Sequence, residues 1–180
     1  TMDSLTGAMN RAAFIAATEQ HLSNAESGYN QCIGSILALD VDSFKTVNDL
    51  FGHHAGDDAL QRIVATARMQ IREADFLGRM GGEEFAIFLV GAELNLALTI
   101  AERVRLAISD IQFKPEGKSH TLSVSIGVYT LKDNKSFAEL YHASDRLLYR
   151  AKNNGRNRVE FDHRQQGAAK TDGRAQFADS

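Results

Sequence analysis

The sequence contains a single cysteine, Cys32, among 180 residues, and it has no long apolar run. One cysteine cannot form a disulfide within the chain, which is typical of a protein from a reducing compartment. No apolar run approaches the ~20 residues of a membrane-spanning helix, and no secretory signal is recognisable. We therefore expect a cytoplasmic domain that makes no membrane contact of its own.

Basic residues are not in excess either. The chain has 20 Lys and Arg against 23 Asp and Glu, which gives a net charge of −3 and a pI of about 6.0. A general nucleic-acid binder, or a domain that binds anionic membranes, carries a basic excess. We expect neither kind of partner.

Length and composition predict one domain. With 43% hydrophobic residues, the chain can bury one well-formed core. We place the domain at residues 1–162 and expect a flexible tail at 163–180, where apolar residues are sparse. Because Thr1 precedes Met2 and the chain opens directly in a motif, we also expect a piece of a longer, membrane-anchored or sensor protein, with an N-terminal regulatory region outside this sequence.

Apolar periodicity predicts helices alternating with a few strands. We predict a helix after an Asn10 N-cap, a loop at Ser27–Asn30, a buried strand at Ile33–Leu39, a helix at Phe44–Phe51 and a helix from an Asp57 N-cap to about Glu73. A hairpin, a helix at Leu94–Ile108, a strand at His120–Thr130, a helix from Phe137 to about Lys152 and an edge strand at Arg158–Phe161 follow. This order predicts an α+β fold, a mixed sheet of about five strands with helices packed on it.

The hairpin is the centre of the pattern. Gly81 and Gly82 separate two apolar stretches, and glycine supplies the positive φ angles of a tight reversal. Glu83 and Glu84 follow at once, past a tip without side chains where an anionic ligand can approach the backbone. By itself, Gly-Gly-Glu-Glu is also compatible with an ordinary hairpin carrying solvated acids.

A second acidic group ends the predicted central strand, at Asp40 and Asp42. Carboxylates there are costly to desolvate unless a cation meets them. If the hairpin pairs beside this strand, Glu83 and Glu84 converge with these aspartates. A carboxylate cluster without His or Cys favours Mg²⁺ or Mn²⁺ over zinc, and such ions can hold polyphosphate.

Five polar side chains are candidate nucleotide contacts. Lys45, Lys152 and Arg156 lie near element ends, where they can reach phosphates, although each is also compatible with a solvated helix charge. Asn48 and Asp57 are candidate base contacts, because a carboxylate accepts from the N–H groups of guanine. From spacing alone, Asp57 is equally compatible with a helix N-cap.

Five motifs together resemble the GGDEF family of diguanylate cyclases, in order and in spacing. They are Asp3-x-Leu5-Thr6-Gly7…Asn10-Arg11, Asp40-x-Asp42-x-Phe44-Lys45-x-x-Asn48-Asp49…Gly52-His53-x-x-Gly56-Asp57-x-x-Leu60, Arg79-x-Gly81-Gly82-Glu83-Glu84-Phe85, Ser125-Ile126-Gly127 and Tyr149-x-Ala151-Lys152-x-x-Gly155-Arg156-Asn157. They span roughly Asp3 to Phe161. The resemblance implies a mainly antiparallel five-stranded sheet, similar to nucleotide cyclase and palm-type catalytic domains.

The resemblance also implies an activity. The family joins two GTP molecules into cyclic di-GMP and releases two pyrophosphates, at the interface of a homodimer in which each domain holds one GTP. Carried onto this chain, the metal ligands for two Mg²⁺ or Mn²⁺ ions per site would be Asp40, the Val41 carbonyl and Glu83. Glu83 would also help deprotonate the 3′-hydroxyl, and Glu84 would shape the catalytic site.

The remaining GTP contacts follow the same resemblance. Asn48 and Asp57 would read guanine, and Gly81 and Gly82 would let phosphate lie close to the backbone. Phosphates would be held by Lys45, Lys152 and Arg156.

Departures from the family pattern are modest. Glu83 stands where Asp is common, Met80 where an aromatic is usual and Ala8 where a leucine is usual. The first is a variant that the family accepts, and the other two are interpreted as packing changes, so the resemblance implies a competent catalyst.

An inhibitory site for the product is also implied. Five residues separate Arg72-Glu73-Ala74-Asp75 from Gly81, the spacing of the family's Arg-x-x-Asp site. Arginine suits phosphate and stacking on guanine, and the aspartate can accept from a guanine edge. Arg103 on the following helix would join them.

Two other functions stay open at this point. Relatives with eroded signatures bind GTP or cyclic di-GMP to regulate an attached domain without catalysis. A third class makes adenine-containing dinucleotides, and Asp57 argues against it because that class usually changes this position.

Overall fold

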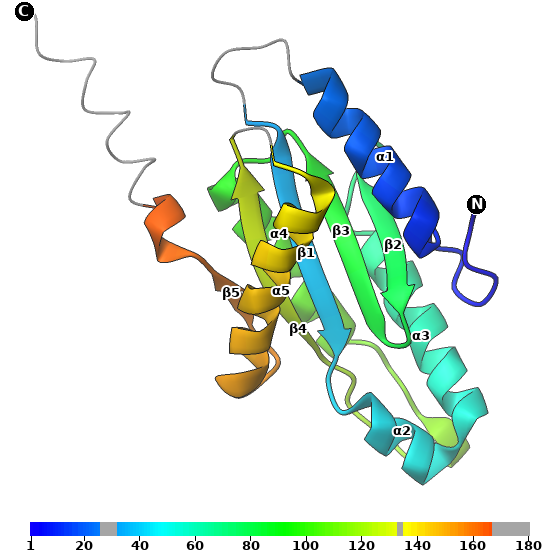
Figure 1. The fold of residues 1–180 in the computed structure, drawn as a ribbon. Helices are drawn as coiled ribbons and strands as arrows, with labels where there is room; N and C mark the ends of the chain where they lie inside the picture. Colours follow the sequence, from blue (N-terminus) through cyan, green and yellow to red (C-terminus); the bar gives the residue numbers. More distant parts are fainter. Residues whose placement is uncertain (26–31, 133–134, 167–180) are drawn as a thin grey trace, which may run out of the picture.

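The structure, a computed structural model, describes residues 1–25, 32–132 and 135–166. Its elements run in the order α1, β1, α2, α3, β2, β3, α4, β4, α5, β5, as predicted (Figure 1). The loop predicted at Ser27–Asn30 and the tail beyond residue 166 lie outside the described residues. Residues 163–166, the first four of the tail predicted at 163–180, form a helical turn.

A five-stranded sheet forms the centre of the fold. Its strands are β1 (Gly34–Val41), β2 (Phe76–Gly81), β3 (Glu84–Val90), β4 (Val124–Leu131) and β5 (Val159–Phe161), in the order β2-β3-β1-β4-β5. All neighbours pair antiparallel except β4 and β5. The mixed, mainly antiparallel sheet is therefore confirmed, with β1 in the middle and β5 at one edge.

Helices cover both faces of the sheet (Figure 1). They are α1 (Arg11–Asn24), α2 (Phe44–Phe51), α3 (His53–Arg68), α4 (Leu94–Ser109) and α5 (Phe137–Asn153). One core cluster joins Leu37 and Leu39 of β1 to α3 and α4, and the other joins Ile36 to α1 and α5. All eight residues of β1 are buried, because helices pack on both of its faces.

The helix boundaries agree with the predictions at most ends. The Asn10 side chain caps α1 by accepting from the Ala13 amide at 2.9 Å, and α2 spans the predicted residues. The last helix, α5, ends as predicted before Gly155, which follows its C-cap Asn154.

The prediction that Asp57 is the N-cap of α3 is wrong. The helix begins at His53, immediately after Gly52, whose φ of 86° turns the chain directly from α2 into α3. Asp57 therefore lies one turn inside the helix, and its side chain makes no hydrogen bond or ion pair within the described residues. A carboxylate that is not used as a cap is available to a ligand.

Two other boundaries differ from the predictions. The α3 helix ends at Arg68 rather than near Glu73, because the chain then turns into β2 with Asp75 accepting from the Arg72 amide. The predicted strand at His120–Thr130 begins only at Val124, because the His120 amide bonds to the Phe113 carbonyl instead.

The N-terminal segment packs along β2, at the other edge of the sheet. The Met9 amide donates to the Leu77 carbonyl at 3.0 Å, and the Arg79 amide donates to the Met9 carbonyl at 2.8 Å. These bonds fasten residues 1–10 to the hairpin that carries the two glycines. Within the ranges that the structure describes, no helix is both long and apolar enough to cross a membrane.

Candidate active site

The end of β1 and the β2–β3 hairpin form one acidic site. Asp40 pairs with Glu84 across the antiparallel ladder, and the Val41 amide donates to the Glu83 carbonyl at 3.2 Å. The expectation that the hairpin pairs beside the central strand is confirmed. It brings Asp40, Glu83 and Glu84 to the same end of the sheet.

The hairpin tip is open. Gly82 lies in the two-residue turn with a φ of 51°, a left-handed conformation that favours glycine. A Cβ added at Gly81 or at Gly82 would meet no atom within 4 Å. The backbone here is thus accessible to a bulky ligand, as the sequence predicts.

Asp40 is nearly buried and meets the cation that its position requires. Its side chain is only 10% exposed, and Oδ2 accepts from the Lys152 ammonium at 2.7 Å. Burial raises the pKa of Asp40 above its ordinary value, Lys152 opposes the rise, and the neighbouring Glu83 and Asp42 add to it. A second positive charge near this carboxylate would therefore be favourable.

Glu84 is in a similar electrostatic environment. Its pKa is raised by burial and by Asp40, partly offset by Lys152, and raised further by Asp145 and Glu83. Burial, Glu84 and Asp145 also raise the pKa of Tyr141 on α5 to about 12. Negative charge thus accumulates at this end of the sheet.

The donors fit a hard divalent cation. They are carboxylate and carbonyl oxygens, which Mg²⁺ and Mn²⁺ prefer, and the Lys152 ammonium occupies the position of a cation beside Asp40. In the described ranges, no group of three or more His, Cys, Asp or Glu side chains is arranged as a ligand set. A cation held by Asp40, Glu83 and the Val41 carbonyl would therefore need further oxygens from a nucleotide or water.

Asp42 does not belong to this acidic site, although the sequence groups it with Asp40. Its carboxylate accepts from the hydroxyls of Ser123 and Ser125 at 2.7 and 2.6 Å, and from the Asn157 amide at 3.0 Å. These partners lie toward β4, on the side of β1 opposite the hairpin.

The two candidate base contacts are close together. The Asn48 amide of α2 packs directly on Gly56 of α3, where a Cβ would lie 1.9 Å from Asn48 Oδ1. Asp57 is the next residue. Across the described ranges, neither Asn48 nor Asp57 has a side-chain hydrogen bond, so both polar groups are available to a ligand.

The three candidate phosphate contacts lie in different surroundings. Lys152 lies in the acidic site, but Lys45 points along the exposed face of α2 and pairs with Asp49 at 2.7 Å. Arg156 follows α5 in a turn with a φ of 62°. Its guanidinium makes no hydrogen bond or ion pair in the ranges that the structure describes.

Two residues that support the hairpin have no role in the sequence analysis, although both lie in its motifs. The Arg79 side chain donates to the Gly82 carbonyl at 2.9 Å and to Asp3 at 3.2 Å. Asp3 also accepts from the Thr6 amide and hydroxyl. Burial would raise the pKa of Asp3, but the bonds from Thr6 and Arg79 outweigh it and lower the pKa.

Arg72 and Asp75 form one unit at the start of β2. The Asp75 side chain has no exposed surface, and it accepts from the Arg72 amide and guanidinium and from the Val90 amide. The Arg72 side chain is 58% exposed. The Arg72 guanidinium also donates to the Val90 carbonyl at 2.6 Å, so Asp75 and Val90 together orient this half-exposed side chain.

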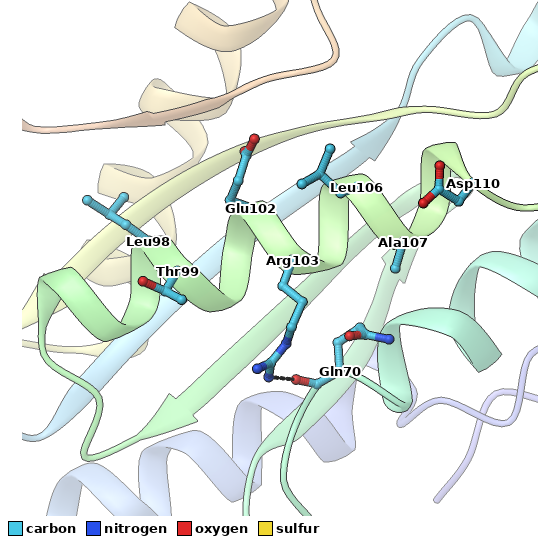
Figure 2. Close-up of a pocket in the computed structure, with 8 residues that line it drawn as sticks. All are labelled: Gln70, Leu98, Thr99, Glu102, Arg103, Leu106, Ala107 and Asp110. Carbon is cyan, nitrogen blue, oxygen red and sulfur yellow. Dashed lines mark hydrogen bonds between the residues drawn. The ribbon is translucent and has the colours of Figure 1, made fainter.

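Arg103 lies nearby, in a groove of about 690 Å³ along α4 (Figure 2). The groove is lined by Gln70, Leu98, Thr99, Glu102, Arg103, Leu106, Ala107 and Asp110. Figure 2 shows the Arg103 side chain reaching from α4 to the Gln70 carbonyl, to which it donates. Gln70 precedes Arg72 by two residues, so this bond fastens Arg103 to the segment that carries Arg72.

Comparison with known proteins agrees with this geometry. The profile of the family described as "Diguanylate cyclase, GGDEF domain" matches residues 1–158. The chain is 37% identical over 158 residues to diguanylate cyclase DgcP of Pseudomonas aeruginosa, covering 88% of this chain and 23% of the relative. It is 39% identical over 161 residues to diguanylate cyclase DgcM of Escherichia coli K12, and this match covers 87% of this chain and 37% of the relative. The chain thus spans 23% and 37% of the lengths of these two relatives.

A solved structure shares the fold. The coiled coil and GGDEF domain of DgcB from Caulobacter crescentus, crystallised with c-di-GMP, superimposes with a TM-score of 0.83 at 28% identity. The match covers 90% of this chain and 85% of that one. The paired hairpin and central strand, the profile match and these relatives lead to one conclusion: the chain belongs to the GGDEF family of diguanylate cyclase domains.

Proposed function

We propose that this domain condenses two GTP molecules into cyclic di-GMP and releases two pyrophosphates. Two copies of the domain would face each other, each holding one GTP. The 3′-hydroxyl oxygen of each GTP would attack the α-phosphorus of the other, and the bond to the β-phosphate would break. The observation that supports this proposal best is the convergence of Asp40, Glu83 and Glu84 beside an open glycine turn.

Asp40, the Val41 carbonyl and Glu83 would hold the two divalent cations, Mg²⁺ or Mn²⁺. Such cations supply positive charge that stabilises the reacting phosphate and lowers the pKa of a bound hydroxyl. Glu83 would accept the proton of the 3′-hydroxyl, since its side chain has no hydrogen-bond partner in the described structure. Glu84, with a raised pKa beside Asp40, would shape the site and add negative potential for the cations.

Asn48 and Asp57 would read the guanine base. The Asp57 carboxylate would accept from guanine N–H groups, and it would meet a ring acceptor of adenine unfavourably. Lys152, Lys45 and Arg156 would bind the phosphates, with Lys45 first leaving its exposed pair with Asp49. The open backbone at Gly81 and Gly82 would allow phosphate oxygens to approach closely.

Product would inhibit the domain at Arg72 and Arg103. The exposed Arg72 guanidinium suits phosphate and guanine, and the buried Asp75 would hold it in place. Arg103 would add a second guanidinium from α4. We place the domain in the cytoplasm, where GTP is available.

The test is GTP turnover with Mg²⁺ over a range of protein concentrations, with the products identified by mass. Because two domains are needed, cyclic di-GMP should form more than linearly with protein concentration. Glu83→Ala and Asp40→Ala should abolish synthesis and leave the thermal unfolding transition cooperative. Turnover that persists in either variant would contradict the metal assignment, and no product at any concentration would indicate a domain that only binds nucleotide.

A further inference from the structure

Asp42 uses both of its carboxylate oxygens within the protein. Oδ1 accepts from the Ser125 hydroxyl at 2.6 Å, and Oδ2 accepts from the Ser123 hydroxyl at 2.7 Å and from the Asn157 amide at 3.0 Å. Its own amide donates to the Ser123 carbonyl at 2.9 Å. Three donors directed at one carboxylate leave little room for a cation, since N–H and O–H groups repel positive charge.

The donor at Asn157 belongs to an unusual turn. Arg156 and Asn157 are consecutive non-glycine residues in the left-handed region, with φ of 62° and 44°. The left-handed region is unfavourable for most residues other than glycine, and such a conformation persists where surrounding bonds hold it. The turn is therefore expected to relax if its bonds are removed.

Those bonds come from three elements. The Arg156 amide donates to the Ala151 carbonyl of α5 at 3.0 Å, and the Asn157 amide donates to Asp42 beyond β1. From α4, the Arg105 guanidinium donates to Asn157 Oδ1 at 2.8 Å. Arg105 is itself only 16% exposed and is held by Glu102. Both sides of Asn157 are thus fixed, and Arg156 lies immediately before it.

Within this turn, the Arg156 side chain is the group without a polar partner in the described structure. In the described structure its guanidinium has no hydrogen bond or ion pair, whereas the amide and side-chain oxygen of Asn157 and both carboxylate oxygens of Asp42 are bonded. A strained turn that is held by bonds at one residue and leaves the side chain of the adjacent residue free is typical of a functional site. It lies beside the end of β1, close to the acidic site.

We propose that Asp42 is a positioning residue for Arg156: its carboxylate anchors the turn at Asn157, so that the Arg156 guanidinium is presented to the phosphates of the nucleotide. Asp42 is then not a ligand of the divalent cations, although it lies two residues from Asp40. This inference rests on the proposed GTP site, and it assigns Asp42 a different task from Asp40.

The experiment compares Asp42→Ala, Arg156→Ala and the double variant with the wild-type domain. We measure KM and kcat for GTP, the Mg²⁺ concentration that gives half-maximal activity, and GTP binding by calorimetry with Ca²⁺ in place of Mg²⁺. Asp42→Ala should raise KM about tenfold, the loss of one charge-assisted contact, with kcat changed less than about threefold. Arg156→Ala should raise KM for GTP by the same factor, and KM of the double variant should be no higher than that of either single variant.

The Mg²⁺ requirement separates this proposal from a metal-ligand role. Asp42→Ala should leave half-maximal Mg²⁺ within about twofold of the wild type, whereas a lost ligand costs tenfold or more. Asn157→Gly is the matched control, because glycine tolerates the left-handed angle and keeps the amide that bonds Asp42. Its KM should rise less than that of Asp42→Ala.

Two results would overturn the proposal. These are a tenfold shift in the Mg²⁺ requirement of Asp42→Ala, or effects of Asp42→Ala and Arg156→Ala that multiply in the double variant. If Asp42→Ala does not fold, Asp42→Asn keeps the volume and one acceptor, and the same comparisons apply. If the wild type makes no cyclic di-GMP, the proposed function fails, and the GTP affinities of the same variants still decide whether Asp42 acts through Arg156.

Discussion

The Lys152 ammonium lies 2.7 Å from Asp40 Oδ2, joining the last turn of α5 to the end of β1 across 112 positions of sequence. The pair is mostly buried, with the side chains 31% and 10% exposed. Packing of α5 on the sheet brings the two together, so the same contact supports the fold and neutralises one carboxylate of the acidic site. Its removal should therefore affect both stability and cation binding.

Lys152→Ala should lower the free energy of unfolding by about 2 kcal/mol without divalent cations, because it leaves Asp40 without its counter-charge. Mg²⁺ should then raise the unfolding temperature more in the variant than in the wild type. Arg62→Ala is the control: its pair with Asp58 is about half exposed, so its loss should cost less than about 0.5 kcal/mol. Equal stability of the two variants would contradict this account.

Arg79 should contribute to the stability of the hairpin and to synthesis of the product. Arg79→Ala removes the bonds to the Gly82 carbonyl and to Asp3, and should cost about 1–2 kcal/mol of stability and lower synthesis. Asp3→Ala should have a smaller effect. A double-mutant cycle measured by urea unfolding should give a coupling of about 1 kcal/mol between them. Strict additivity would show that Asp3 does not act through Arg79.

Periodicity predicted the elements of this fold because each helix or strand has a local pattern. The five strands of the sheet and the helices α1 to α5 were predicted in order. The convergence of Asp40 with the hairpin followed from the pairing of two apolar strands. The N-cap at Asp57 failed for a local reason. A left-handed Gly52 lets α3 begin one turn earlier, which no rule of spacing signals.

The partners of buried polar groups could not be predicted in the same way. Asp42 looks like Asp40 in the sequence, but its acceptors are used by Ser123, Ser125 and Asn157, which lie 81 to 115 residues away. Asp75 likewise looks available to a ligand until Val90 and Arg72 are seen to surround it. Such contacts depend on register and packing across the sheet, which one sequence does not display.

Asp75→Ala should destabilise the domain by about 3 kcal/mol, since it leaves the Arg72 and Val90 amides without a buried acceptor. Binding of cyclic di-GMP should weaken with it, because Arg72 loses its orientation. Glu73→Ala, a change at an exposed neighbour, should stay within about 0.5 kcal/mol of the wild type. Unchanged urea unfolding of Asp75→Ala would show that this carboxylate is dispensable to the fold.

The raised pKa of Asp40 has a consequence for stability against pH. A folded-state pKa above the unfolded value of 3.8 means that the folded domain binds the proton more tightly. Relative to Asp40→Asn, the wild type without divalent cations should lose stability as the pH rises through the raised pKa, and regain it as the pH falls toward 3.8.

Thermal unfolding of both proteins in EDTA over this pH range is the measurement. Added Mg²⁺ should remove the loss at higher pH, because a cation favours the ionised carboxylate. If the stability of the wild type relative to Asp40→Asn rises with pH in EDTA, the sign is opposite to the one expected. The effect of Lys152 on the pKa of Asp40 would then outweigh the effect of burial.

Gly56 should control base selectivity through its neighbour. A Cβ at this position would lie 1.9 Å from Asn48 Oδ1 and 3.1 Å from Phe44 Cζ, so Gly56→Ala must displace the Asn48 amide. The backbone of α3 is helical at Gly56, and alanine favours a helix by about 1 kcal/mol over glycine, which opposes any loss of stability. KM for GTP should rise about tenfold, with kcat nearly unchanged.

The cycle with Asn48→Ala decides how Gly56 acts. If the glycine serves to seat Asn48, Gly56→Ala should have little further effect once Asn48 is truncated, and both single variants should lose preference for GTP over ITP, which lacks the 2-amino group. Loss of kcat with unchanged KM, or effects that multiply in the double variant, would instead place the role of Gly56 in the packing of α2 on α3. The GTP-to-ITP ratio carries the decision, because a purely structural defect would lower turnover of both nucleotides alike.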